Sequence, residues 1–206
     1  AMGLSAGNSI TGNNYVVIGN SAGYSSSGNG NVFIGASTGY SNTGANNYCF
    51  GESSCYSNTG GNNYFIGNSA GYSSSGNYNY IFGKQAGYSS GGGYNYIFGS
   101  SAGYNSTGTK NYILGDSAGY SNSGNSNLLF GNSSGYNNTG NYNIFIGEFA
   151  GYTNTSGSGN LVAGYNAGYS NELGSKNIFL GYEAGYNETG SNKLYVSNSS
   201  TSEPLI

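Results

Sequence analysis

The residues that could do chemistry in this chain are few, and their types argue against catalysis. The sequence has no His, and its Asp and Glu residues total 7, none of which recurs as a close pair. General acid–base catalysis needs a positioned group with a tuned pKa. Parallel β-helix enzymes place carboxylates or Arg in a groove, and this chain has no Arg. We therefore expect no enzymatic activity, no metal site and no cofactor.

Two cysteines lie on either side of a glycine, at Cys49 and Cys55 with Gly51 between them. In an exported protein such a pair readily forms a disulfide, and a link across one corner of the chain is plausible. Two free buried thiols are the alternative. Two thiols without His make no credible metal site.

Tyrosine is the most abundant aromatic side chain, with 23 copies. Eleven of them share one phase of the sequence and are expected to form a ladder: Tyr24, Tyr40, Tyr56, Tyr72, Tyr88, Tyr104, Tyr120, Tyr136, Tyr152, Tyr169 and Tyr186. They are either structural rungs in a core or interface, or a carbohydrate-binding surface of many weak sites. Ice binding is a third possibility, but it needs a regular Thr array, and the residues after each Tyr mix Ser, Asn and Thr.

The pattern Asn-x-Ser/Thr marks candidate N-glycosylation sites. It begins at six positions: Asn105, Asn132, Asn137, Asn154, Asn187 and Asn198. Several such matches arise by chance in a chain rich in Asn, Ser and Thr, so they support modification only weakly.

The elements that must position these residues are twelve copies of one short unit. The copies open at Gly3, Gly19, Gly35, Gly51, Gly67, Gly83, Gly99, Gly115, Gly131, Gly147, Gly164 and Gly181. Positions within a copy are numbered from its opening Gly, which is position one. Position five is Gly except at Cys55, position six is Tyr except at Asn8, and position ten is always Gly. Positions fourteen to sixteen are apolar.

The composition excludes several classes of partner. Only 5% of residues are charged and 40 are Gly, which is often a sign of disorder, but the net charge is only −3 and the aromatic residues recur at fixed phase. We interpret the chain as an ordered repeat. Four basic residues offer no stripe for nucleic acid, and no run of 18 apolar residues could cross a membrane.

The repeat pattern predicts an all-β fold, a parallel β-solenoid or β-roll of twelve coils of about 16 residues. Repeated Gly disfavours a helix, whereas apolar triplets bounded by Gly, Asn and Ser indicate short strands and turns. Each coil is expected to hold two strands, a long one ending in the triplet and a short one around Ala-Gly-Tyr. Coils about 4.8 Å apart make a rod of roughly 55 Å.

The predicted domain organisation is simple. Ala1 and Met2 are typical of a cloning remnant, residues 3–196 form the solenoid, and residues 197–206 form a C-terminal transition segment. Because successive side chains of a strand point to opposite faces, each triplet makes both faces apolar. One face needs a second cover, so we expect a homotrimer. The alternative is a monomer with an exposed aromatic ladder.

The unit Asn143-Ile144-Phe145-Ile146-Gly147-Glu148-Phe149-Ala150-Gly151-Tyr152 resembles repeats of bacterial surface proteins and phage tail-fibre-like proteins. It is more loosely similar to the β-roll of trimeric autotransporter adhesin heads. The resemblance implies a stacked fibre, and the segment 191–206 resembles the hand-over to a tail-fibre C-terminal region. It says little about the ligand.

These observations together predict a non-enzymatic structural or adhesive fibre segment, an adhesin head or a tail-fibre-like shaft. We expect it outside the cell, on a cell surface or in a virion fibre. Its partners are expected to be further copies of itself, and a surface glycan or a host or cell receptor. A carbohydrate-binding module that uses stacked Tyr and Asn ladders is the competing interpretation.

Overall fold

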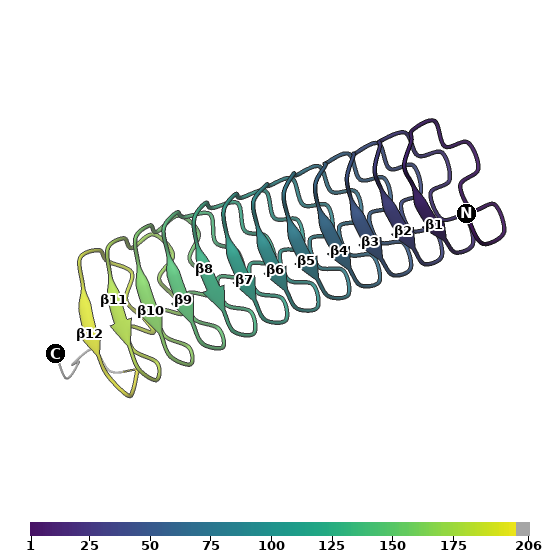
Figure 1. Ribbon diagram of the computed structural model, residues 1–206. Helices are drawn as coiled ribbons and strands as arrows, with labels where there is room; N and C mark the ends of the chain where they lie inside the picture. The colour runs from purple at the N-terminus through teal and green to yellow at the C-terminus, as the bar shows by residue number, and fades with distance from the viewer. Residues whose placement is uncertain (201–206) are drawn as a thin grey trace.

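The computed structural model describes residues 1–200, which form one straight rod of stacked coils (Figure 1). The expected transition segment 197–206 lies partly outside the described residues. Each coil contributes one three-residue strand: β1 (Val16–Ile18), β2 (Val32–Ile34), β3 (Tyr48–Phe50), β4 (Tyr64–Ile66), β5 (Tyr80–Phe82), β6 (Tyr96–Phe98), β7 (Tyr112–Leu114), β8 (Leu128–Phe130), β9 (Ile144–Ile146), β10 (Leu161–Ala163), β11 (Ile178–Leu180) and β12 (Leu194–Val196).

The strands form one parallel sheet in sequence order along one side of the rod (Figure 1). Every strand pairs with the equivalent residues of the next, as in Tyr80↔Tyr96 and Ile81↔Ile97. The all-β parallel solenoid predicted from the repeat is therefore confirmed. The register passes through both 17-residue steps unchanged, because Leu161 pairs with Ile144 and with Ile178.

The second strand expected around Ala-Gly-Tyr is wrong. Backbone φ is positive at positions three, five and seven of most coils, as at Ser69 (55°), Gly71 (62°) and Ser73 (52°). This alternation produces consecutive tight turns, with hydrogen bonds such as Tyr72 N to Ser69 O (3.3 Å). A residue with positive φ is excluded from an extended strand, so the sheet has only one strand per coil.

Turns and strands nevertheless stack through the same kind of bond. In the turn segment, backbone N–H groups alternate between the coil on either side, as in Ser69 N to Glu52 O (2.8 Å) and Gly71 N to Ala86 O (2.9 Å). Bonds between coils thus continue around most of the perimeter. Met2 joins them at the first coil, with Met2 N bonded to Val17 O at 2.9 Å, so it belongs structurally to the rod.

The interior of the rod has an apolar half and a polar half. The apolar half holds position fifteen of each strand, such as Phe65 and Ile97, and position four, such as Ala70, all with no exposed surface. The polar half holds Asn or Ser at position eight and Asn at position thirteen, which are also buried. Only positions fourteen and sixteen of the strands face outward, as the alternation within each triplet predicts.

Glycine at position ten is required by contact between coils rather than by its φ angle. A Cβ atom built on Gly92 would lie far inside van der Waals contact of Gly108 O, and 3.0 Å from Asn95 Nδ2. Position ten stacks glycine on glycine in the same way along most of the rod. The coils therefore approach one another most closely along this line.

The last coil departs from the repeat where the others are buried. Glu188 stands at position eight, Lys193 at position thirteen and Tyr195 at position fifteen. The Tyr195 hydroxyl donates to Glu188 Oε2 at 2.6 Å, and this hydrogen bond lowers the pKa of Glu188. Terminal repeats of solenoids commonly carry such polar substitutions, which cover the end of the core.

The first coil is also atypical. Position eight is Ile10, position six is Asn8 and position thirteen is Tyr15. Ile10 and Tyr15 pack against the apolar core while remaining partly exposed, and the Tyr15 hydroxyl donates to Gly28 O. Both ends of the described rod thus differ from the coils between them.

The contact at position ten yields a test with a neighbouring glycine as its control. Gly92→Ala should lower the free energy of unfolding by about 2–3 kcal/mol, because the added methyl forces two backbones apart. Gly91→Ala should leave stability unchanged or raise it by about 0.5 kcal/mol, since the nearest atom to its Cβ is Thr107 Cγ2 at 3.6 Å. Chemical denaturation measures both, and equal effects would contradict the close-approach explanation.

Candidate functional site

The eleven tyrosines expected to form a ladder stand in one continuous column, here called the tyrosine column. Their rings stack face to face, with successive centroids 4.8 Å apart at Tyr72–Tyr88 and 5.2 Å apart at Tyr136–Tyr152. Stacking runs without interruption from Tyr24 to Tyr186. The rings are half-buried. Each stacked pair contributes about 0.5–1.5 kcal/mol beyond burial, so the column supports the rod.

The stacking bears on the carbohydrate hypothesis. A sugar binds an aromatic side chain by covering its face, but each inner ring of the column has both faces occupied by neighbouring rings. The interplanar angle of Tyr72 and Tyr88 is 1° and that of Tyr40 and Tyr56 is 3°. The column therefore offers a ligand only ring edges and hydroxyl groups along most of its length.

Burial and crowding raise the pKa of three tyrosines of the column. Burial raises the pKa of Tyr72, and the neighbouring Tyr88 and Tyr56 raise it further because two adjacent phenolates would repel. The same two causes, in the same order, raise the pKa of Tyr136 and of Tyr169. These phenols consequently hold their protons more tightly in the folded rod than in the unfolded chain.

A second aromatic column lies on the strand face, which is formed by positions fourteen and sixteen of all twelve strands. Tyr48, Tyr64, Tyr80, Tyr96 and Tyr112 stack at centroid distances of 4.7–5.0 Å. Tyr80 is 37% exposed and Tyr112 is 53% exposed. Beside them Phe82 stacks on Phe98 at 4.7 Å. No position of this face carries a charged residue.

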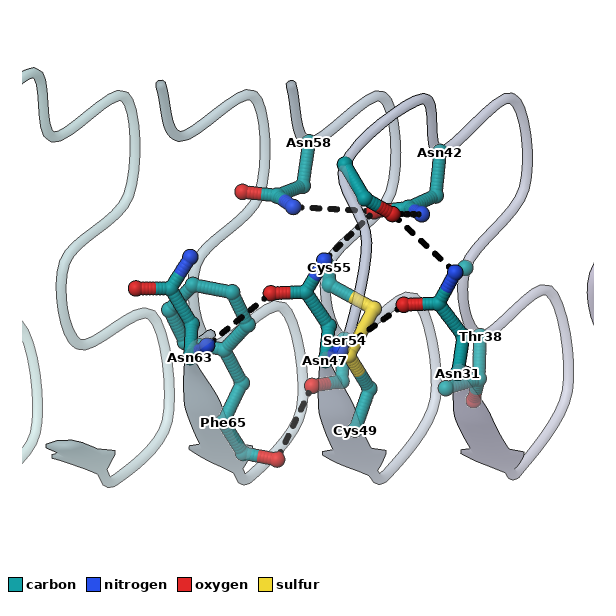
Figure 2. Close-up of a disulfide and its surroundings, with 12 residues drawn as sticks. Asn31, Thr38, Asn42, Asn47, Cys49, Ser54, Cys55, Asn58, Asn63 and Phe65 are labelled. Carbon is teal, nitrogen blue, oxygen red and sulfur yellow. Dashed lines mark hydrogen bonds between the residues drawn. A yellow bond between two sulfur atoms is a disulfide. The ribbon is translucent and has the colours of Figure 1, made fainter. Parts of the chain in front are cut away.

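The buried Asn residues at position thirteen link each coil to the next with both ends of their amides. Asn95 Oδ1 accepts from Asn111 N at 2.9 Å, and Asn95 Nδ2 donates to Gly108 O at 3.0 Å. Figure 2 shows the same pattern from Asn31 through Asn47 to Asn63. The ladder ends where Lys193 N donates to Asn177 Oδ1 at 2.9 Å.

The Asn residues at position eight form two shorter ladders separated by Ser74, Ser90 and Ser106. Asn58 Nδ2 donates to Asn42 Oδ1 at 2.8 Å, as Figure 2 shows. Three buried side-chain oxygens have no partner near the ends of these ladders: Asn58 Oδ1 in the first, and Asn154 Oδ1 and Asn171 Oδ1 in the second. An unpaired buried acceptor costs about 1–3 kcal/mol, so the ends of these ladders are local weak points.

Cys49 and Cys55 are joined by a disulfide with a Cα–Cα distance of 6.1 Å (Figure 2). Cys49 occupies the core position fifteen and Cys55 the glycine position five of the next coil. Elsewhere a Cβ at position five would collide with the position-fifteen side chain, for example at 2.5 Å from Phe65 Cδ1 when built on Gly71. A cysteine fits at position five because its partner at position fifteen is also cysteine.

The candidate glycosylation sites divide by exposure. Asn105, Asn132, Asn137, Asn187 and Asn198 are exposed. Asn154 is 1% exposed, and its Nδ2 donates to Asn138 Oδ1 at 2.6 Å and to Gly157 O at 2.9 Å. An attached sugar at Asn154 would therefore require the amide to leave the core of the folded rod.

Comparison of the chain with protein-family models, with curated proteins and with solved structures finds no match. Its function must accordingly be inferred from the geometry. Within residues 1–200, no group of three or more Cys, Asp or Glu side chains could hold a metal ion. In the same part of the chain, no helix has the length and apolar character to cross a membrane.

Some residues with clear structural roles carried little signal in the sequence. The recurrence of Asn at position thirteen was visible, but only the coordinates show that both ends of the amide bond to the next coil. The mixture of Asn and Ser at position eight resembles random polar sequence until burial is known. The last coil departs from the repeat at three positions at once, and this could have marked it, from the sequence alone, as different. The three residues are Glu188, Lys193 and Tyr195.

Asn95→Asp tests the position-thirteen ladder through its pH dependence. The carboxylate would be buried against Gly108 O, which raises its pKa above the unfolded value of about 3.9. Stability should be near that of the wild type below that value, where the acid can donate, and should fall as pH rises through the folded pKa, with a loss of about 3 kcal/mol at neutral pH. Denaturation across pH measures the difference.

The matched control is Asn77→Asp at exposed position eleven. Asn77 Oδ1 accepts from Gly61 N at 2.6 Å, and a carboxylate can accept equally well. Its stability should therefore not decline between acid and neutral pH. If both variants declined alike, the buried donor of Asn95 would not be the cause.

The raised pKa values of Tyr72, Tyr136 and Tyr169 predict alkaline sensitivity. The folded state binds its phenolic protons more tightly, so the stabilisation is complete below the unfolded pKa of about 10 and is lost as pH rises through the higher folded values. The phenolate absorbance of these three residues, taken as the difference between the wild type and a variant in which all three are Phe, should appear at higher pH in the folded rod than in the denatured chain. The triple variant Y72F/Y136F/Y169F keeps the stacking and should lose stability less steeply in alkali; an unchanged slope would contradict this explanation.

Proposed function

We propose that this chain is a non-enzymatic structural and adhesive segment of an extracellular fibre, and that it assembles as a homotrimer through the strand face. The observation that carries the proposal is the strand face itself. It is apolar at both outward positions of all twelve strands and is uncharged from end to end. Water-exposed apolar surface of this continuity marks an interaction site.

The size of the strand face supports association between copies. Its length along the axis is about 53 Å from the spacing of parallel strands, and its outward side chains include Ile66, Phe98 and Ile146 at 41%, 38% and 38% exposure. At about 40 Å² for each side chain, the exposed apolar area is on the order of 1,000 Å², beyond the few hundred Å² common on monomers. About 800 Å² per partner suffices for a stable interface.

The last coil bears on the direction of assembly. Charged or hydroxyl-bearing residues replace the repeat at the last coil, where Glu188 and Lys193 interrupt the inner ladders. Such an end is a poor template for stacking another rod, so the side-by-side arrangement is favoured. Three copies around a threefold axis bury all three strand faces and keep the Ser, Thr and Asn columns of the turns outside.

An extracellular setting agrees with the covalent and charge properties of the rod. A disulfide joins Cys49 to Cys55, and disulfides persist in oxidising compartments. Backbone groups are bonded around most of each coil, which leaves few segments that could open to a protease. The function we infer is therefore mechanical, namely to hold a long, weakly charged rod and present its polar columns to a receptor or neighbouring cell.

Charge on the strand face tests the assembly. In Tyr64→Lys/Tyr96→Lys, two alternate rungs carry a charge where copies meet, and burial of unpaired charge strongly opposes association. The wild type should sediment as a trimer of its 21.1 kDa chain, and the variant as a monomer with an unchanged circular dichroism spectrum. Ser75→Lys/Thr107→Lys places the same charges on exposed turn positions and should remain trimeric.

Three outcomes would count against the proposal. A monomeric wild type would remove the assembly, and dissociation of the turn variant would show a general charge effect. A glycan array in which the monomeric variant binds a sugar as tightly as the wild type would instead favour a carbohydrate-binding module whose contacts are Asn, Ser and Tyr hydroxyl groups.

A further inference from the structure

Tyrosine is the main target for an oxidant in this chain. The sequence has no Trp and no His, and its one Met is Met2. Both cysteines are held in the disulfide. Tyrosine is thus the side chain from which a one-electron oxidant most readily removes an electron, and the chain has 23 of them.

The tyrosine column arranges these groups in a way that an unfolded chain cannot. Every inner ring has a ring above and below it, at centroid distances such as 4.9 Å for Tyr88–Tyr104 and 4.8 Å for Tyr104–Tyr120. The planes are parallel within 5° and 8° at these two steps. Because the rings are related by the step from coil to coil, the carbon ortho to one hydroxyl lies beside the equivalent carbon of the next ring.

We propose that the tyrosine column is a site of oxidative covalent cross-linking, at which dityrosine bonds join successive coils. A one-electron oxidant, such as a peroxidase with hydrogen peroxide, removes one electron from each of two neighbouring tyrosines. Each phenol releases its proton to water, which reaches these half-buried rings. The two phenoxyl radicals then form a carbon–carbon bond between their ortho positions, and loss of the two ortho protons as the ring hydroxyls are reprotonated restores both aromatic rings. In total two electrons go to the oxidant and two protons to the solvent.

The column favours this coupling for two physical reasons. Neighbouring rings have nearly the same surroundings, so a radical formed at one rung can exchange with the next at little energetic cost. Two radicals on one rod can therefore come to adjacent rungs, where the partner is already in place. The product is restricted to tyrosines one coil apart, which are 16 or 17 residues apart in sequence.

The consequence is a second kind of covalent link along the rod. The Cys49–Cys55 disulfide joins position fifteen of one coil to position five of the next. A dityrosine would join position six to position six across any of the ten steps of the column. Its formation depends only on the geometry of one chain and stands apart from the proposed trimer.

Photo-oxidation with a ruthenium tris-bipyridyl complex and persulfate supplies the one-electron oxidant in a test. Protein is oxidised at high dilution, then denatured, reduced and digested with thermolysin, which cuts before the apolar residues of each strand and leaves one column tyrosine in most peptides. Mass spectrometry should find dityrosine between peptides of successive coils, such as Tyr72–Tyr88. The yield should exceed that of protein oxidised in denaturant at least fivefold.

Tyr104→Phe separates the column from general tyrosine chemistry. Phe keeps the stacked ring but cannot form a phenoxyl radical, so the Tyr88–Tyr104 and Tyr104–Tyr120 links should vanish while Tyr56–Tyr72 persists. The control Tyr94→Phe removes a 56%-exposed tyrosine of position twelve and should leave every column link at its wild-type yield. Circular dichroism confirms that both variants keep the fold.

The proposal is overturned if cross-links are scattered among tyrosines of unrelated positions, or if denatured protein gives an identical pattern and yield. It is also overturned if cross-links are confined to the strand face, with none between position-six tyrosines. Loss of all column links in Tyr94→Phe would likewise show that ring stacking does not select the partners.

Discussion

The backbone hydrogen bonds between coils fix the spacing on which every other feature of the rod depends. They hold neighbouring coils in register at the strands, as in Phe65↔Ile81, and in the turns, as in Ser73 N to Tyr56 O at 2.7 Å. A repeat of about 4.8 Å is also a favourable separation for stacked aromatic rings. Glycine at position ten permits this spacing, because any Cβ atom there would overlap the carbonyl oxygen of the position-ten glycine in the next coil.

The same spacing allows half of the core to be polar. A buried amide is tolerated when its nitrogen and its oxygen each have a hydrogen-bond partner. The position-thirteen Asn residues meet that condition because the next coil presents the same backbone groups to each of them. Position eight meets it less completely. Ser74 does not supply the donor that an Asn would give, so Asn58 Oδ1 is left unpaired. Polar burial here is secure only while the repeat continues unchanged.

The sequence predicted the architecture well because period and pattern are properties that every coil shares. The 16-residue step, the outward positions of the strands and the alignment of Tyr24 to Tyr186 all followed from repetition and strand alternation. The second strand was wrong because Ser69 and Ser73 adopt positive φ, and no residue-type preference reports that a serine does so. The burial of Asn154 could not be predicted, because exposure depends on which side of the turn a residue occupies.

The functional features divide in the same way. The ladder of tyrosines could be predicted, but its occupied ring faces could not, since they depend on ring orientation. The matched pair of Cys49 and Cys55 was visible as an exception to the repeat. Its steric reason, that position five touches position fifteen, required the coordinates. The end coils depart from the repeat at single positions, and a single sequence gives such departures little weight.

The direction of the bonds between coils determines how the rod would respond to tension. They run along its axis, so a pull on the two ends would load one coil at a time and detach coils singly from an end. Each event would release about 50 Å of chain, given 16 residues at roughly 3.4 Å each. The disulfide between Cys49 and Cys55 spans a sequence separation of 6 and would shorten the release at one coil only. Such a rod would yield in equal steps under load, as an extensible tether does, instead of breaking at once.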